Sequence, residues 1–159
     1  MNLTKIEVVV QVGGTGFQPV EVEDIEALRQ RAYAVMKDVE SYSGYMSSVN
    51  DVKILKQEGN LIITRWDAKI DGSPFTWIQE VESIDESQEM IFEAVEGDFD
   101  VFRGRWSVAE SDGRVELRLL IEYRLGIPVI ENVLGPILKK KVKADSELML
   151  EALAAQVSR

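Results

Sequence analysis

The stretch that decides the fold is VIENVLGPILKKKVKADSELMLEALAAQV, residues 129–157. Apolar residues recur in it at intervals of three and four, which is the spacing of one face of an α-helix. The predicted apolar stripe consists of Leu134, Leu138, Leu148, Met149 and Ala152, with Ile137 and Val142 at its margins. Because Pro136 fits only an early helix position or a kink, we expect a short turn over 129–134 before the main helix. That helix spans about 30–40 Å at roughly 1.5 Å per residue, so it crosses a small domain.

Most of the chain before this helix alternates between apolar and polar residues, which is typical of β-strands. The predicted strands cover 3–12, 50–57, 60–70, 74–84, 88–95, 99–109 and 113–125. Short links rich in Gly, Asp, Asn and Ser join the last six strands, so these form antiparallel hairpins. Residues 24–37 have helical spacing, and 38–46 predict a second short helix or a tight turn.

This order of elements predicts an α+β fold in a single domain, 1–159. It consists of a seven-stranded, curved antiparallel sheet, two short helices after the first strand, and the long C-terminal helix over the concave face. The helix either packs tightly on the sheet or leaves a hollow, and the sequence leaves both open.

The chain has no histidine and no cysteine. These absences exclude disulfides, thiol nucleophiles, histidine-based catalytic triads and most zinc sites. Acid–base chemistry would therefore depend on Asp, Glu, Lys, Tyr or water, and we expect neither a metal nor a cofactor.

The charge balance is acidic, with 28 Asp and Glu against 18 Lys and Arg, a net charge of −10. Nucleic-acid binding is not expected, because phosphate contacts need clustered basic residues. No apolar run is long enough for a membrane span, and the N-terminus has no secretion signal, so we expect a cytoplasmic protein. The exception to the acidic balance is a run of four lysines, Lys139, Lys140, Lys141 and Lys143.

The predicted concave face of the sheet is aromatic. Strand alternation places Trp66, Trp77 and Trp106 on it. The polar residues Thr64, Gln79 and Tyr123 share that face. An apolar, aromatic wall with a few placed polar groups is the composition of a ligand pocket. The alternative, equally open, is a filled core in which these polar groups bond internally.

Two charged residues, Lys141 and Asp145, fall within the predicted stripe of the long helix. Charges on an apolar face are unfavourable unless they are paired or hydrated, and a spacing of four lets the two meet. Our hypothesis is that they line a partly hydrated cavity. The alternative is that the lysine stem reaches outward and Asp145 lies at the rim.

Several motifs carry a resemblance to a known family. They are AVMKDVESY at 34–42, Tyr45-Met46 before a strand, Phe75-Thr76-Trp77 after an Asp-Gly turn, and YRLGIP at 123–128 before the last helix. With the element order, they resemble the START-like helix-grip superfamily over roughly 30–155. More narrowly, the chain is similar to the polyketide cyclase/dehydrase and lipid-transport family, which includes coenzyme Q-binding START proteins and aromatase/cyclases.

This resemblance implies a cavity between sheet and long helix that holds a bulky hydrophobic or aromatic molecule. One reading is a binding or transfer protein for a polyketide-, quinone- or lipid-like ligand. The alternative is a polyketide cyclase, aromatase or dehydratase acting in the same cavity, with Tyr123 and then Asp145 as candidate proton donors. The pocket arginine of the aromatase/cyclases is not matched, because its position here is Val81. A third reading is a regulatory or interaction module with a filled core.

The predicted ligand contacts combine the concave face with the helix. They are Thr64, Trp66, Trp77, Gln79, Phe92, Trp106, Tyr123, Leu138, Lys141 and Met149. The lysine run at 139–143 is either a contact for a membrane surface or an acyl carrier protein, or a solvated face. The segment 13–24, longer than the family's usual link, is open to a role as a lid or as a contact in a homodimer.

Overall fold

The computed structural model describes residues 3–12 and 22–158. The elements are β1 Thr4–Gln11, α1 Val22–Lys37, the 3-10 helix η1 Val39–Gly44, β2 Val49–Glu58, β3 Leu61–Ile70, β4 Ser73–Ile84, β5 Glu89–Gly97, β6 Val101–Ser111, β7 Arg114–Arg124 and α2 Pro128–Val157. Each predicted element is present, with its ends within two residues of the prediction. Of the segment 13–24, residues 13–21 lie outside the described residues, so its role as a lid or as a contact in a homodimer stays a prediction.

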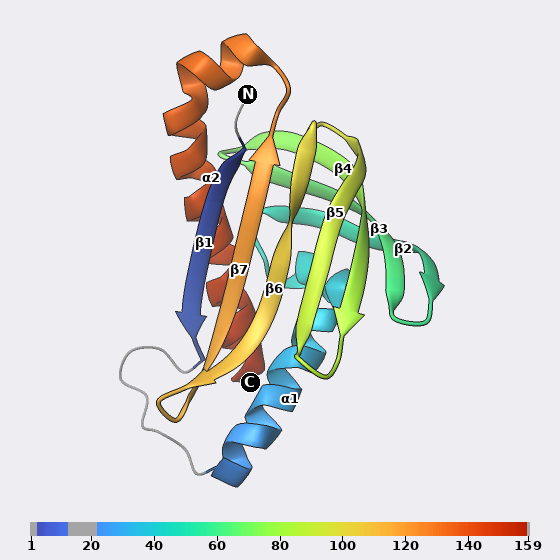
Figure 1. Cartoon of the computed structure of the whole chain (residues 1–159), viewed down its shortest axis with the longest axis vertical. Helices are drawn as coiled ribbons and strands as arrows, with labels where there is room; N and C mark the ends of the chain where they lie inside the picture. Colours follow the sequence, from blue (N-terminus) through green and yellow to red (C-terminus); the bar gives the residue numbers. More distant parts are fainter. Residues whose placement is uncertain (1–2, 13–21, 159) are drawn as a thin grey trace.

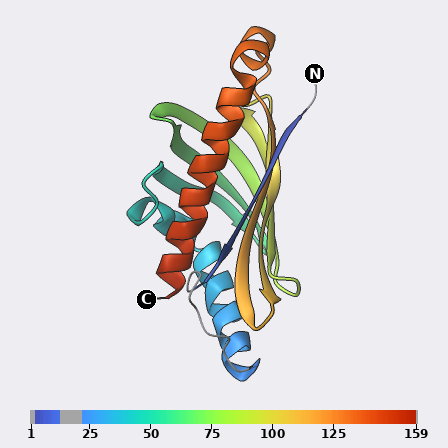
Figure 2. The ribbon, with the colours of Figure 1, turned by 90° about the vertical axis from the view of Figure 1, so that its left-hand side faces the viewer.

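The seven strands form one antiparallel sheet in the order β1-β7-β6-β5-β4-β3-β2. Consecutive strands from β2 to β7 are neighbours, as their short links predict. Strand β1 lies at the edge of the sheet, beside β7. The sheet curves strongly, and α2 runs along its concave side (Figure 1, Figure 2). The predicted helix-grip α+β fold is therefore confirmed.

Helix α2 differs from the prediction at its start. The expected separate turn over 129–134 was wrong, because α2 is one helix of 30 residues that begins at Pro128 and contains Pro136. The first turns bend away from the rest of the helix (Figure 1). A proline inside a helix removes a hydrogen bond and clashes with the preceding turn, which bends the helix without ending it.

The buried face of α2 also differs from the predicted apolar stripe. Leu134 and Leu148, both assigned to the buried stripe, are 46% and 54% exposed. The buried face instead carries Val142, Ser146, Leu150, Leu153 and Val157. Positions 148–150 are all apolar, so the local pattern does not decide which of them faces the sheet.

Candidate functional site

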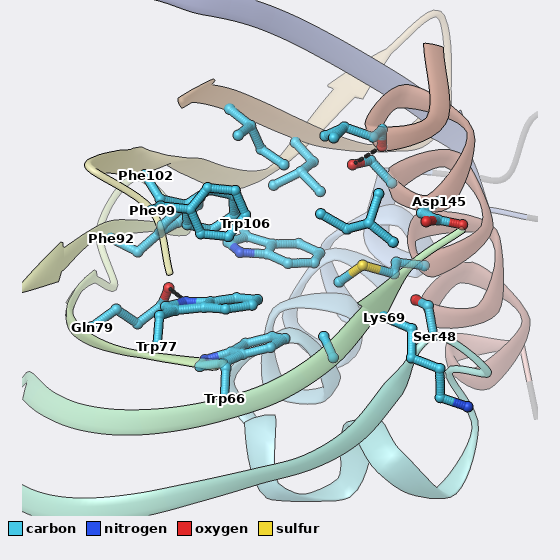
Figure 3. A pocket seen from close by; sticks show the side chains of 17 residues that line it. Ser48, Trp66, Lys69, Trp77, Gln79, Phe92, Phe99, Phe102, Trp106 and Asp145 are labelled. Carbon is cyan, nitrogen blue, oxygen red and sulfur yellow. Dashed lines mark hydrogen bonds between the residues drawn. The ribbon is translucent and has the colours of Figure 1, made fainter. Parts of the chain in front are cut away.

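A small space of about 60 Å³, here called the inner cavity, lies between the concave face of the sheet and α2. The sheet side is aromatic, formed by Trp66, Trp77, Phe92, Phe99, Phe102 and Trp106. Asp145 of α2 lies opposite (Figure 3). Met149 of α2 also lines the space. Ligand pockets measure about 300–1,000 Å³, whereas this space holds only a few water molecules. The interior is therefore much less hollow than expected, because the aromatic rings fill most of it.

The rings of this wall pack in a fixed arrangement. Trp66 and Trp77 face each other across β3 and β4, with ring centroids 5.6 Å apart and planes 10° from parallel. Phe102 lies 5.0 Å from Trp77 and 4.6 Å from Phe99, measured between ring centroids. Such ring pairs are worth about 0.5–1.5 kcal/mol each beyond their buried area, so the stacking stabilises the wall.

Two polar residues of the concave face accept hydrogen bonds from the indole N–H groups of tryptophans. The Trp66 Nε1–H donates to Thr64 Oγ1 at 3.1 Å, and the Trp77 Nε1–H donates to Gln79 Oε1 at 2.8 Å. In both cases the acceptor is two residues away on the same strand, and therefore on the same face. These bonds fit the filled-core alternative for Thr64, which is fully buried. Gln79 keeps contact with the inner cavity.

Tyrosines form one end of the aromatic cluster. The ring of Tyr42 lies 5.8 Å from both Trp66 and Trp106, and its hydroxyl donates to the Met36 carbonyl. Burial, with the nearby Tyr45 and Asp38, raises the Tyr42 pKa well above its usual value. Burial, assisted by the negative charge of Asp38, raises the pKa of Tyr45 to about 12. The neutral forms of both phenols are therefore stabilised by the fold.

We predict that the protein loses stability in alkali. A tyrosine whose folded pKa exceeds its unfolded value of about 10 stabilises the fold below that pH. This contribution falls away as the pH rises from about 10 towards the folded pKa, since only the unfolded chain releases the proton easily. The measurement is the free energy of unfolding by urea between pH 9 and about 12. In Tyr45→Phe the alkaline decline should be shallower, and an unchanged decline would contradict the role of Tyr45.

A tight turn connects β3 and β4 at the edge of the inner cavity. Asp71 and Gly72 both have left-handed backbone conformations, with φ of 51° and 82°, as a two-residue hairpin of the Asp-Gly type requires. The Asp71 backbone N–H donates to Asp145 Oδ2 at 3.1 Å, and Lys141 Nζ lies 3.4 Å from Asp71 Oδ1. We call these contacts the Asp71 latch. The expected meeting of Lys141 with Asp145 is replaced by contacts of both residues with the turn.

A second and larger space, the outer groove, lies on the far side of this latch. It measures about 540 Å³ and is open to solvent. Its apolar lining includes Phe75, Leu125, Ile127, Leu134 and Leu138. Ile70 lines both spaces, so it and the latch separate the inner cavity from the outer groove.

The predicted site residues fall into three groups: those that line the inner cavity, those that line the outer groove, and those that line neither. The inner cavity is lined by Trp66, Trp77, Gln79, Phe92, Trp106, Asp145 and Met149. The outer groove is lined by Leu138 and Lys141. Thr64 and Tyr123 line neither space. Tyr123 is buried, and its ring forms an edge-to-face pair with Phe99, with ring centroids 6.3 Å apart.

Sequence reasoning missed Phe99, which lines the inner cavity. The predicted strand 99–109 included it, whereas in the structure it lies in the link between β5 and β6, where strand alternation does not apply. Phe102, which strand alternation puts on the same face as Trp106, also lines the inner cavity but is not among the predicted ligand contacts. The clustering of Phe99 and Phe102 around a turn next to Trp106 was the signal available.

Residues 3–12 and 22–158 lack two features. No group of three or more His, Cys, Asp or Glu side chains is arranged to hold a metal ion. No helix in that part of the chain is long and apolar enough to cross a bilayer.

The chain is similar to several solved structures. TTHA0849 from Thermus thermophilus is 25% identical, with a TM-score of 0.80 over 98% of this chain and 97% of that one. The Zhui aromatase/cyclase from Streptomyces sp. R1128 is 17% identical, with a TM-score of 0.81 over 99% and 94%. A START superfamily protein from Mycobacterium smegmatis is 18% identical, with a TM-score of 0.71 over 99% and 98%. These likenesses extend over the whole architecture, including α2.

No curated protein sequence matches the chain. Residues 25–147, which are more than half of the chain, match the family described as polyketide cyclase / dehydrase and lipid transport. The match includes the turn of the Asp71 latch, the whole aromatic wall and α2 as far as Glu147. With a START-like helix-grip fold built around that wall, the chain belongs to the polyketide cyclase/dehydrase and lipid transport family.

Proposed function

We propose that the protein binds a bulky hydrophobic or aromatic molecule, polyketide-, quinone- or lipid-like, as a binding or transfer protein. The site would form where the inner cavity and the outer groove join. The observation that carries this proposal is the continuity of the aromatic wall. Phe75 of the outer groove stacks on Phe99 at 5.2 Å, and Phe99 meets Trp77 of the inner cavity at 5.6 Å.

The two volumes support a joined site. The inner cavity alone, at about 60 Å³, is below the size of a ligand pocket, whereas the outer groove has about 540 Å³. Family membership supports hydrophobic-ligand binding or a cyclase role. A ligand that lies in the groove and extends its aromatic or apolar end past Ile70 would contact both parts of the wall.

The alternative is a cyclase, aromatase or dehydratase acting on a poly-β-keto or aromatic substrate. Asp145 favours it, because this carboxylate lines the inner cavity. Two features favour simple binding: Tyr123 lines neither space, and Val81, at the family's arginine position, is a buried apolar residue. If Asp145→Asn and Tyr123→Phe both left turnover of a polyketide substrate unchanged, these residues would have no catalytic role.

Native mass spectrometry of protein purified from its own host tests the binding proposal. We expect a co-purifying hydrophobic molecule. In Val142→Phe, which places a ring in the inner cavity from α2, this molecule should be lost. Ala144→Phe, with the same ring on the exposed side of α2, is the matched control and should retain it. An empty wild-type protein, with tryptophan fluorescence unchanged by quinone, fatty acid and polycyclic aromatic probes, would contradict the proposal.

The Asp71 latch predicts how fast such a ligand exchanges. Asn accepts a left-handed backbone conformation, so Asp71→Asn keeps the turn while it removes the carboxylate that pairs with Lys141. Because both side chains are exposed, we expect the unfolding free energy to change by less than about 1 kcal/mol. The release rate of a bound fluorescent fatty acid, measured by stopped flow, should rise several-fold.

A matched control comes from another exposed ion pair. Lys56 and Glu58 of β2 lie 3.3 Å apart, away from both spaces. Lys56→Gln should leave stability and release rate unchanged. Equal release rates in wild type, Asp71→Asn and Lys56→Gln would show that the latch does not limit exchange.

A further inference from the structure

The first turns of α2 extend beyond the ends of the strands at one end of the molecule (Figure 1, Figure 2). Large apolar side chains are exposed there: Ile127 is 51%, Val133 68% and Ile137 58% exposed, and Leu134 is exposed beside them. We call these four residues the apolar rim. Apolar side chains gathered in this way on an exposed helix mark a contact surface.

The lysine run continues directly from the apolar rim. Lys139, Lys140 and Lys143 are exposed, and within the described part of the chain none of them is in an ion pair. The carboxylates around the groove are engaged locally. Asp71 pairs with Lys141, Asp98 accepts the Thr76 backbone N–H at 2.8 Å, and Asp100 pairs with Arg124 at 2.8 Å. In a chain with a net charge of −10, this part of α2 therefore carries a local group of positive charges.

We propose that this end of the protein docks on the surface of an anionic lipid bilayer. A helix with apolar side chains beside lysines lies in the membrane interface, with the apolar groups among the acyl chains and the ammonium groups at the headgroups. Lysine stems are long enough to cover apolar surface while the charged ends stay in water.

The outer groove argues for a bilayer over an acidic protein as the partner. Ile127, Leu134 and Ile137 belong both to the apolar rim and to the lining of the groove. Docking through the rim therefore places the groove mouth against lipid, where a hydrophobic ligand can pass without crossing water. This proposal rests on the proposed function for its purpose, but the docking itself requires no ligand.

Vesicle flotation tests the docking with empty vesicles. The wild-type protein should bind vesicles of phosphatidylcholine with about one third phosphatidylglycerol, but not phosphatidylcholine alone, and added salt should weaken the binding. The triple variant Lys139→Gln, Lys140→Gln and Lys143→Gln should bind about 100-fold more weakly. The charge-matched control is Lys53→Gln, Lys56→Gln and Arg65→Gln, all exposed on β2 and β3, which should bind like wild type.

A single label tests which residues enter the lipid. Because the chain has no cysteine, a cysteine introduced in Val133→Cys is unique and can carry an environment-sensitive dye. Its emission should shift to the blue on addition of the anionic vesicles. The same dye on Glu110→Cys, an exposed position near the far end of β6, should not respond.

The outcomes separate the two proposals. Absence of wild-type binding, equal binding by the two triple variants, or binding to an acyl carrier protein without binding to vesicles would each overturn the docking. Ligand binding is measured separately through the tryptophan fluorescence of the protein without vesicles. If the wild-type protein bound vesicles but its tryptophan fluorescence showed no ligand binding, the proposed function would be contradicted and the docking would stand.

Discussion

Replacing Gly104 by alanine is expected to destabilise the fold by about 3–5 kcal/mol, a very large effect for the addition of one methyl group. A Cβ atom at this position would lie 1.8 Å from the Leu120 carbonyl oxygen and 2.8 Å from Phe92 Cζ. The first of these atoms belongs to the backbone of β7, the neighbour of β6 in the sheet. The Leu120 carbonyl oxygen cannot move away without distorting the hydrogen bonds between β6 and β7. Phe92 Cζ belongs to a ring that lines the inner cavity.

Urea unfolding of Gly104→Ala measures this effect, and Gly44→Ala is the matched control. A Cβ at Gly44 meets nothing within 4 Å, and its backbone is not left-handed. We expect its unfolding free energy to stay within about 0.5 kcal/mol of wild type. Similar losses in the two variants would show that backbone crowding at β6 and β7 is not what requires glycine.

Trp77 should give the largest combined effect on stability and ligand binding. Its ring contacts Trp66, Phe99 and Phe102, so Trp77→Ala leaves a cavity at the centre of the wall. The expected loss is about 3–5 kcal/mol in unfolding free energy. The affinity for a polycyclic aromatic probe should also fall, because the ring that connects the inner cavity to Phe99 and Phe75 is gone.

A smaller substitution distinguishes the contribution of the Trp77 ring from that of its hydrogen bond to Gln79. Trp77→Phe keeps an aromatic ring but leaves the buried Gln79 Oε1 without its donor, at an expected loss of about 1–3 kcal/mol. The double variant Trp77→Phe and Gln79→Leu removes both polar groups and should recover part of that loss. If the double variant lost as much as the two single variants together, the bond between Trp77 and Gln79 would contribute nothing measurable.

The strands were predictable because each carries a clear alternation and ends at a turn with its own residue chemistry. Trp66, Trp77 and Trp106 are buried on one face for that reason. Which face of α2 packs against the sheet was not predictable in the same way. The apolar run at 148–150 fits more than one face, and Pro136 is compatible both with a helix start and with a position inside a helix.

The contents of the site were predictable in kind but not in volume. Alternation tells which rings point inward, whereas the space left between them depends on how they stack. Phe99 shows the difference: it comes from a link and packs against Phe75, Trp77 and Phe102. The Asp71 latch was hidden for a related reason, since Asp71 and Asp145 are 74 positions apart and meet only because α2 crosses the β3–β4 turn.

The near-parallel packing of Trp66 and Trp77 gives the protein an intrinsic optical sensor. Two indoles at 5.6 Å couple their electronic transitions, and the chain has three tryptophans in all, so this pair should dominate the near-ultraviolet circular dichroism. A guest that enters between sheet and helix must alter the geometry of the pair or its surroundings. Occupancy can therefore be followed in unlabelled, unmodified protein, whatever the guest is.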